Sequence, residues 1–195
     1  MSYLIAILLL VTGCSGVYPV TTGSFLAPDT PPIARTVKPT VVIVGTHPVA
    51  VSAMTRMVQG FGAQVVERAR LQDILDEHGV TLTNDAAILR VGRLIGATTI
   101  VFVETTVQPQ NHTGAFYLAD MGAGLTNQTA YHIAVSIRSV QVETGLVRWQ
   151  GSAWFPEPVN SPDQAVAIAT AAAMERVLCE QRQGMWDMKH GCAVH

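Results

Sequence analysis

Charged side chains are scarce in this sequence, and neither sign dominates. Only 13% of the 195 residues are charged, and 12 Lys and Arg stand against 14 Asp and Glu, for a net charge of -2. Because neutralising phosphates requires a clustered excess of Lys and Arg, this balance argues against nucleic acid as a partner. Hydrophobic residues make up 49% of the chain, which is enough for the core of one domain.

The sequence also lacks the residue sets that define common active sites. We find no Ser/His/Asp or Cys/His set, and the passage 44–48 lacks both the GxGxxG pattern and the lysine of a phosphate loop. His190, Cys192 and His195 lie close together near the C-terminus, but their spacing matches no standard zinc pattern. We therefore expect no enzyme, no metal and no cofactor.

The first residues are typical of a secreted protein held by a lipid. The apolar run Leu4–Val11 has the length of a signal peptide and is too short to span a bilayer as a helix. Val11–Cys14 resembles a bacterial lipobox, although no Lys or Arg precedes the apolar run. We predict a signal peptide over residues 1–13 and a Cys14 that carries diacylglycerol and palmitate. The alternative is an ordinary cleaved signal, with Cys14 an incidental core residue.

A segment rich in Thr, Pro, Gly and Ser follows, and we interpret residues 14–39 as a lipidated, extended tether. Ser15, rather than Asp, follows the lipobox cysteine, and by resemblance to enteric lipoproteins this favours the outer membrane. We therefore expect the chain on the periplasmic face of that membrane. The alternative for this segment is an ordered arm that lies on a neighbouring subunit.

Apolar residues alternate between strand and helix spacing from residue 40 onward. The first half of this region predicts strand, helix, strand, helix, helix and strand, at 40–46, 49–61, 64–66, 71–78, 85–95 and 98–103. The second half predicts a hairpin of strands 131–142 and 146–155 around a turn at Glu143–Gly145, and then a helix over 165–183. That helix is either a buried core helix or an interface helix. The fold class is α/β (α+β), a mixed β-sheet flanked by helices.

Two cysteines remain beyond Cys14. An oxidising periplasm would allow Cys179 and Cys192 to form a disulfide. The alternative is two unrelated free thiols, one in a helix and one in the C-terminal tail, which we place at residues 188–195.

Several segments, taken in order, resemble the curli production assembly/transport (CsgG-like) family of outer-membrane lipoproteins. The resemblance covers most of a periplasmic domain at residues 40–187. Its most specific part is the hairpin around Tyr131–Arg138 and Val142–Gly145. The other matching segments are 67–77, 92–104 and 184–187.

The resemblance implies a ring of subunits, with transmembrane hairpins that form a pore for unfolded amyloid subunits. Residues 107–130 are barely long enough for such a hairpin, and Pro109 is among the residues that break its alternation. We therefore predict a flexible loop with an apolar tip of Phe116, Tyr117 and Leu118, in contact with a neighbour or the membrane surface. The alternative is that the tip folds back onto the sheet.

The function we expect is that of a non-enzymatic, outer-membrane-anchored lipoprotein that works as an oligomeric assembly or transport component on the periplasmic side. Its partners would be other copies of itself or proteins of a secretion machinery. Two alternatives stay open. One is a reduced export channel, and the other is a regulatory lipoprotein that activates a peptidoglycan synthase.

Overall fold

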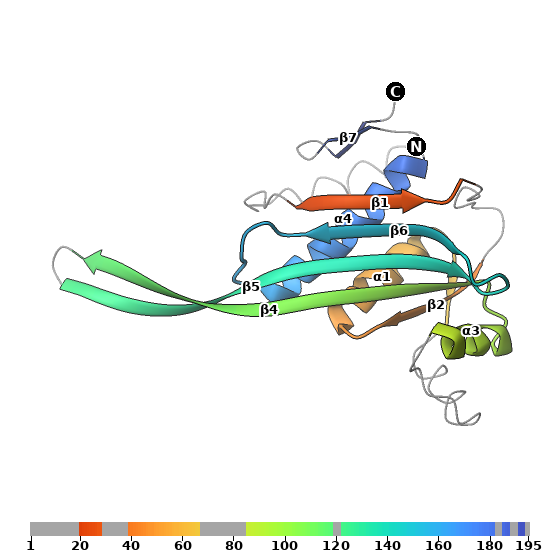
Figure 1. The fold of residues 1–195 in the computed structure, drawn as a ribbon, viewed down its shortest axis with the longest axis horizontal. Coiled ribbons are helices and arrows are strands. Elements are labelled where there is room, and N and C mark those ends of the chain that lie inside the picture. Colours follow the sequence, from red (N-terminus) through yellow and green to blue (C-terminus); the bar gives the residue numbers. More distant parts are fainter. Residues whose placement is uncertain are drawn as a thin grey trace, which may run out of the picture.

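One six-stranded mixed sheet organises the chain, with strands in the order β1-β6-β5-β4-β2-β3 (Figure 1). The computed structural model describes residues 20–28, 39–66, 85–118, 122–181, 185–187 and 191–193. β2 runs parallel to β3 and β4, and the other neighbours are antiparallel. The strands are β1 (Thr21–Leu26), β2 (Thr40–Gly45), β3 (Gln64–Val65), β4 (Thr99–Leu118), β5 (Gly122–Gln141) and β6 (Val147–Trp154).

Helices cover both faces of this sheet, as the sequence predicts. They are α1 (Pro48–Gly60), α3 (Asp85–Leu94) and α4 (Pro162–Gln181). Val101 and Val103 of β4 share one buried cluster with α1 and α4, whereas Ile100 shares a second cluster with α3. Because successive strand residues point to opposite faces, the two clusters lie on the two sides of the sheet. The α/β class with a mixed, helix-flanked sheet is therefore confirmed. The helix predicted at residues 71–78 lies outside the described residues.

α4 is the main support of the sheet, and its small residues allow a close approach. Ala169 and Ala173 are completely buried, and Gly151 of β6 faces the helix backbone at Ala173. A Cβ on Gly151 would collide with the Ala173 carbonyl group and would lie 2.9 Å from Cγ2 of Val177. This packing confirms the prediction of a buried core helix.

The N-terminal segment corrects one prediction. We predicted residues 14–39 as an extended tether, but residues 21–26 form the edge strand β1, antiparallel to β6 of the same chain. Ser24 adds side-chain contacts to this docking, because its hydroxyl donates to Oε1 of Glu180 on α4 over 2.5 Å and accepts from Nε of Arg176 over 3.0 Å. The pattern of residues around Ser24 does not predict this docking, because both partners of Ser24 lie more than 150 residues away in the sequence.

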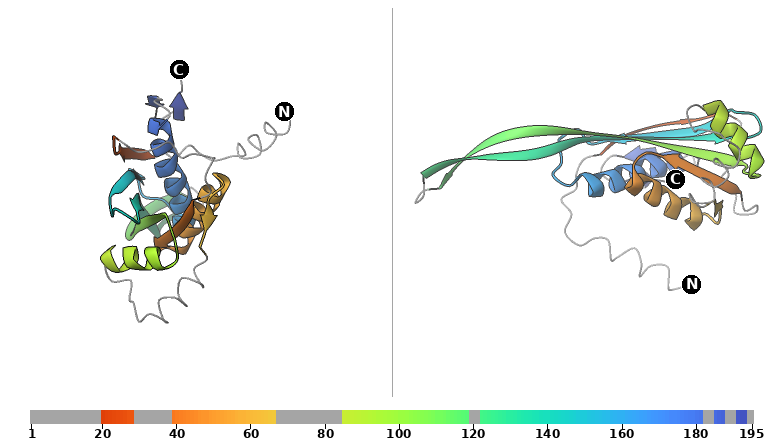
Figure 2. Two further views of the ribbon diagram at one scale, coloured as in Figure 1. Left: turned by 90° about the vertical axis from the view of Figure 1, so that its right-hand side faces the viewer. Right: turned by 90° about the horizontal axis from the view of Figure 1, so that it is seen from below.

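The region 107–130 corrects a second prediction. We predicted a loop, but β4 and β5 are each twenty residues long and pair without interruption from Thr99↔Gln141 to Leu118↔Gly122. Their outer halves leave the sheet as a twisted two-stranded ribbon (Figures 1 and 2). Apolar alternation is required of a strand only where one face is buried. The ribbon lies beyond the core, so its backbone pairing imposes no such pattern.

The C-terminal residues contain a small second sheet. β7 (Met185–Asp187) pairs antiparallel with β8 (Gly191–Ala193), and both contact α4. β8 falls within residues 188–195, which we predict as the C-terminal tail.

Candidate functional site

The projecting hairpin is the candidate site, and its root is set by where neighbouring strands end. β2 pairs with β4 only as far as Gly45↔Val103, and β6 pairs with β5 only as far as Trp154↔Ala134. One isolated bridge follows, in which Tyr131 N donates to Val159 O over 2.8 Å and Val159 N donates to Tyr131 O over 2.9 Å. Beyond these points, no other strand among the described residues lies beside β4 or β5. The ribbon therefore has two unpaired edges.

The inner part of the ribbon is polar. His132 Nε2 lies 2.7 Å from Oε1 of Gln110, and the Thr129 hydroxyl donates to Oδ1 of Asn111 over 3.2 Å. Gln110, Asn111 and Thr129 are exposed. Such cross-strand pairs stabilise a ribbon only modestly, by about 0.2–1 kcal/mol each.

Charge is concentrated at the root and is nearly absent further out. The guanidinium of Arg138 lies 3.6 Å from the Glu104 carboxylate and sits over the ring of Phe102, 4.4 Å from its centroid. Between residues 105 and 130 the only carboxylate is Asp120, and there is no Lys or Arg. The ribbon can therefore approach another ribbon without charge repulsion.

A ribbon of this kind offers two edges to a further strand. Two antiparallel strands alone are at best marginally stable in water, and unpaired edges present rows of N–H and C=O groups to any further strand. The geometry thus provides an element for association with another chain or with a membrane.

The described residues contain no group of three or more His, Cys, Asp and Glu side chains that could hold a metal ion. His47, at the end of the passage 44–48, lies 3.9 Å from the mostly exposed carboxylate of Asp163. Within the described residues, no helix has both the length and the apolar character needed to cross a bilayer.

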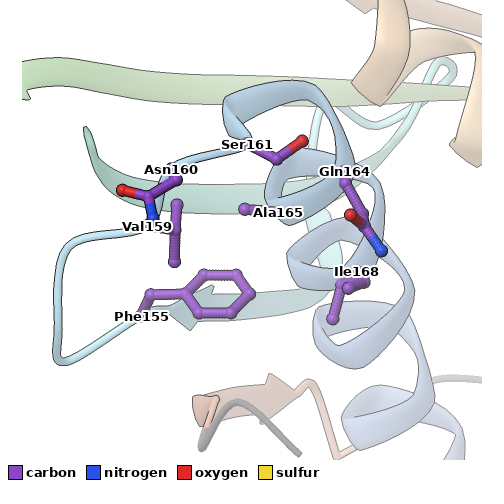
Figure 3. A pocket seen from close by; sticks show the side chains of 7 residues that line it. All are labelled: Phe155, Val159, Asn160, Ser161, Gln164, Ala165 and Ile168. Atoms are coloured by element: carbon purple, nitrogen blue, oxygen red, sulfur yellow. The ribbon is translucent and has the colours of Figure 1, made fainter. Parts of the chain in front are cut away.

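Two hollows lie among the described residues of the domain, both away from the ribbon. The first lies where β6 leads into α4, and Figure 3 shows Phe155 and Val159 at its base, with Ile168 on one side. Its volume of about 30 Å³ leaves room for about one water molecule. The second, of about 350 Å³, is an open hollow with Arg93 and Glu143 on its wall. Arg93 Nε already donates to the Val142 carbonyl over 3.3 Å.

The site residues predicted from the sequence are Cys14, the tip residues of the hairpin and the two remaining cysteines, and the structure does not bring them together in one place. Cys14 lies outside the described residues. Phe116, Tyr117 and Leu118 end β4, where their backbone pairs with Gly124, Ala123 and Gly122. This end of the hairpin points away from the sheet, so the fold-back alternative does not describe the backbone (Figure 1).

Cys179 is 1% exposed and is disulfide-bonded. Cys192 lies on β8, which contacts α4. The pairing of Cys179 with Cys192 stays a prediction.

The free edges of the ribbon could not be predicted from the sequence. The only signal for them was the uncharged composition of residues 107–118, which an ordinary polar loop also has.

Fold and site together define a small α/β domain that carries a mixed sheet between helices and extends one strand pair far beyond it. Residues 47–150, more than half of the chain, match the family described as curli production assembly/transport component CsgG. The chain belongs to this family, and the resemblance drawn from the sequence motifs is confirmed. No curated protein matches the chain.

Solved structures with a similar course of the chain come from several bacteria. The PelC dodecamer from Paraburkholderia phytofirmans is 13% identical over 80% of this chain and 94% of its own, with a TM-score of 0.46. The lipoprotein GNA1162 from Neisseria meningitidis is 16% identical over 71% and 97%, with a TM-score of 0.44. The LpoB C-terminal domain from Salmonella enterica is 12% identical over 64% and 84%, with a TM-score of 0.41.

Proposed function

We propose that this protein is a non-enzymatic, outer-membrane-anchored lipoprotein that self-associates on the periplasmic side as an assembly or transport component. One observation carries the proposal: the β4–β5 ribbon leaves the sheet with two unpaired, uncharged edges. Membership of the CsgG family supports the same function. Cys14 is the proposed site of acylation, and residues 15–20 are the proposed tether.

The relative lengths of tether and ribbon support a position at the lipid surface. From Cys14 to Thr21 the chain can reach at most about 25 Å, since a residue spans at most about 3.6 Å. Thr21 pairs with Trp154, Trp154 with Ala134, and Ala134 with Thr106, so Thr21 and Thr106 lie at one level of the sheet.

From that level the ribbon extends a further twelve residues to Leu118, or about 40 Å. β1 also begins at the end of the sheet from which the ribbon projects (Figure 1). The ribbon is therefore longer than the fully extended tether. A chain anchored at Cys14 in this orientation would bring the hairpin tip to the membrane.

The test is the double variant Phe116→Ser and Leu118→Ser, with assembly measured by sedimentation in mild detergent. We expect the protein to shift from assembly to protomer while its melting temperature stays nearly unchanged. The matched control is Phe25→Ser with Leu146→Ser, two residues that are 53% and 58% exposed elsewhere on the domain and should leave assembly intact. An assembled hairpin variant would refute the proposal, and a much lower melting temperature would show that the tip belongs to the core.

A reduced export channel is a second candidate, and one observation favours it. By sequence alone, residues 107–130 are barely long enough for a membrane hairpin. Beyond the bridge at Tyr131 the ribbon consists of residues 110–118 and 122–130, close to the roughly 9–11 residues per strand that cross a bilayer, so length does not exclude a membrane hairpin. Between β6 and α4, however, only residues 155–161 are present, which leaves no room for a second hairpin. Stable single-channel conductance of the wild type in planar bilayers would decide for the channel.

A further inference from the structure

β1 is held to the domain more weakly than the long strands of the main sheet. None of its six residues is buried, whereas β2, β4, β5 and β6 each contain at least two buried residues. It lies at the edge of the sheet, and β6 is its only partner among the described strands. Elements with few buried contacts open at a lower free energy than the core, so β1 can open while the rest of the domain stays folded.

The contact between β1 and α4 is largely polar. Ser24 bonds to Glu180 and Arg176, whose side chains are 28% and 25% exposed and form an ion pair over 3.2 Å. Thr22 points to the same side of β1 as Ser24, and its buried hydroxyl oxygen has no hydrogen-bond partner among the described residues. Leu26 adds one partly buried apolar contact. Because water can replace the bonds of Ser24 once β1 leaves, these contacts add only modestly to the docking.

The backbone of β1 bonds to β6 through every second residue. Ala27 N donates to Arg148 O over 3.0 Å. Residues two apart face the same side, so the N–H of Phe25 also points to β6, as do those at positions 23 and 21. The N–H of Thr22 points away from β6. Proline is tolerated in an edge strand only where its missing N–H would face away from the neighbour, so it should disrupt docking at position 25 and not at position 22.

Release of β1 would move the attachment of the domain from one end of the sheet to the other. Thr21, where β1 begins, lies at the level of Thr106 and the root of the ribbon. β2 begins at the opposite end, since Val41 pairs with Thr99. The seven residues of β4 between these two levels span about 23 Å. With β1 docked, the N-terminal chain joins the sheet at the ribbon end, and with β1 released it joins at Thr40.

We infer that β1 is a releasable strap whose docking on β6 directs the ribbon toward the membrane. The inference rests on the proposed anchor at Cys14 and names the element that orients the domain on it. Release lengthens the free chain from the seven residues between Cys14 and Thr21 to the 26 between Cys14 and Thr40. Its maximum reach grows from about 25 Å to about 90 Å. Effective concentration falls roughly as the −3/2 power of tether length, so that of the hairpin tip at the lipid drops about 7-fold.

The first test is hydrogen exchange of the full-length protein in lipid vesicles. The amides at positions 21, 23 and 25 bond to β6, and those of Gly151 and Ala153 bond to β5. We expect the first set to exchange at least about tenfold faster than the second. In Ser24→Ala, which loses the bonds to α4, the first set should exchange faster by a further factor of about 3 to 10. Equal exchange of both sets in the wild type would overturn the inference, because β1 would then open only with the whole domain.

The second test compares two proline variants of β1. Phe25→Pro removes an N–H that bonds to β6, and the matched control Thr22→Pro removes one that points away. A fluorophore on Asp120→Cys, between the ends of β4 and β5, reports contact of the hairpin tip with vesicles that carry a quencher in their headgroups. Protein without this substitution gives the background of the native thiols. We expect the equilibrium constant for tip contact to fall about 7-fold or more in Phe25→Pro and to stay at the wild-type value in Thr22→Pro. Slow exchange of the Gly151 amide shows that each variant is folded.

The outcomes separate the role of β1 from the proposed function. If Phe25→Pro keeps wild-type contact although the amides at positions 21 and 23 exchange freely, β1 does not orient the domain and the inference is overturned. Equal loss of contact in Thr22→Pro and Phe25→Pro overturns it too, since the loss then does not come from release. If the wild-type tip does not touch lipid at all, the proposed position of the hairpin fails, and the orienting role of β1 fails with it.

Discussion

Gly151→Ala should destabilise the domain strongly, because β6 and α4 meet there at the shortest distance their backbones allow. The new methyl group would collide with the carbonyl group of Ala173 and crowd Val177, whose Cγ2 would lie 2.9 Å away. A flexible side chain could turn aside, but a helix carbonyl can yield only if the helix moves. Overpacking a rigid core costs about 1–3 kcal/mol, and we expect the upper end of that range.

For a chain of this size, about 3 kcal/mol corresponds to a loss of about 6–12 °C in melting temperature. The assay is thermal unfolding by circular dichroism, with Gly60→Ala as the control. Gly60 ends α1 with a φ that is not positive and with open space around its missing Cβ, so this variant should be neutral or up to about 1 kcal/mol more stable. If Gly151→Ala melts within about 1 °C of the wild type, α4 does not rest on β6 as closely as described.

Three further predictions concern the anchor, the core and the cysteines. Cys14→Ala should leave the precursor unprocessed or the protein soluble in the periplasm, and unchanged recovery in the outer-membrane fraction would contradict lipidation. Ile100→Ala removes a completely buried side chain from a central strand and should cost about 2–5 kcal/mol in a urea melt, whereas a loss well below 1 kcal/mol would show that the surroundings of β4 are not tightly packed. Cys179 and Cys192 should both resist alkylation in unreduced protein purified from the periplasm, and labelling of both thiols would reject their pairing.

The core strands and the turn between them could be predicted because their residues carry the physical signal of burial. Val101, Val103 and Ile137 lie between layers, and the turn after β5 contains Gly145 with a φ of 71°, as its position after Glu143 and Thr144 indicates. The start of α4 was predictable for the same local reason, since Pro162 suits a first helical turn. These features depend on neighbours in sequence, so the sequence by itself determined them.

Only the tertiary structure decided the course of β1 and of the outer hairpin. Ser24 of β1 docks through Arg176 and Glu180, which are remote in sequence and give no local pattern. The hairpin beyond Pro109 is held by pairing between backbones, which nearly any sequence can make, and no covering layer imposes an alternation on it. Spacing in sequence reports which faces are buried. It does not report how far two strands continue once they have left the core, and the candidate site of this protein lies in that continuation.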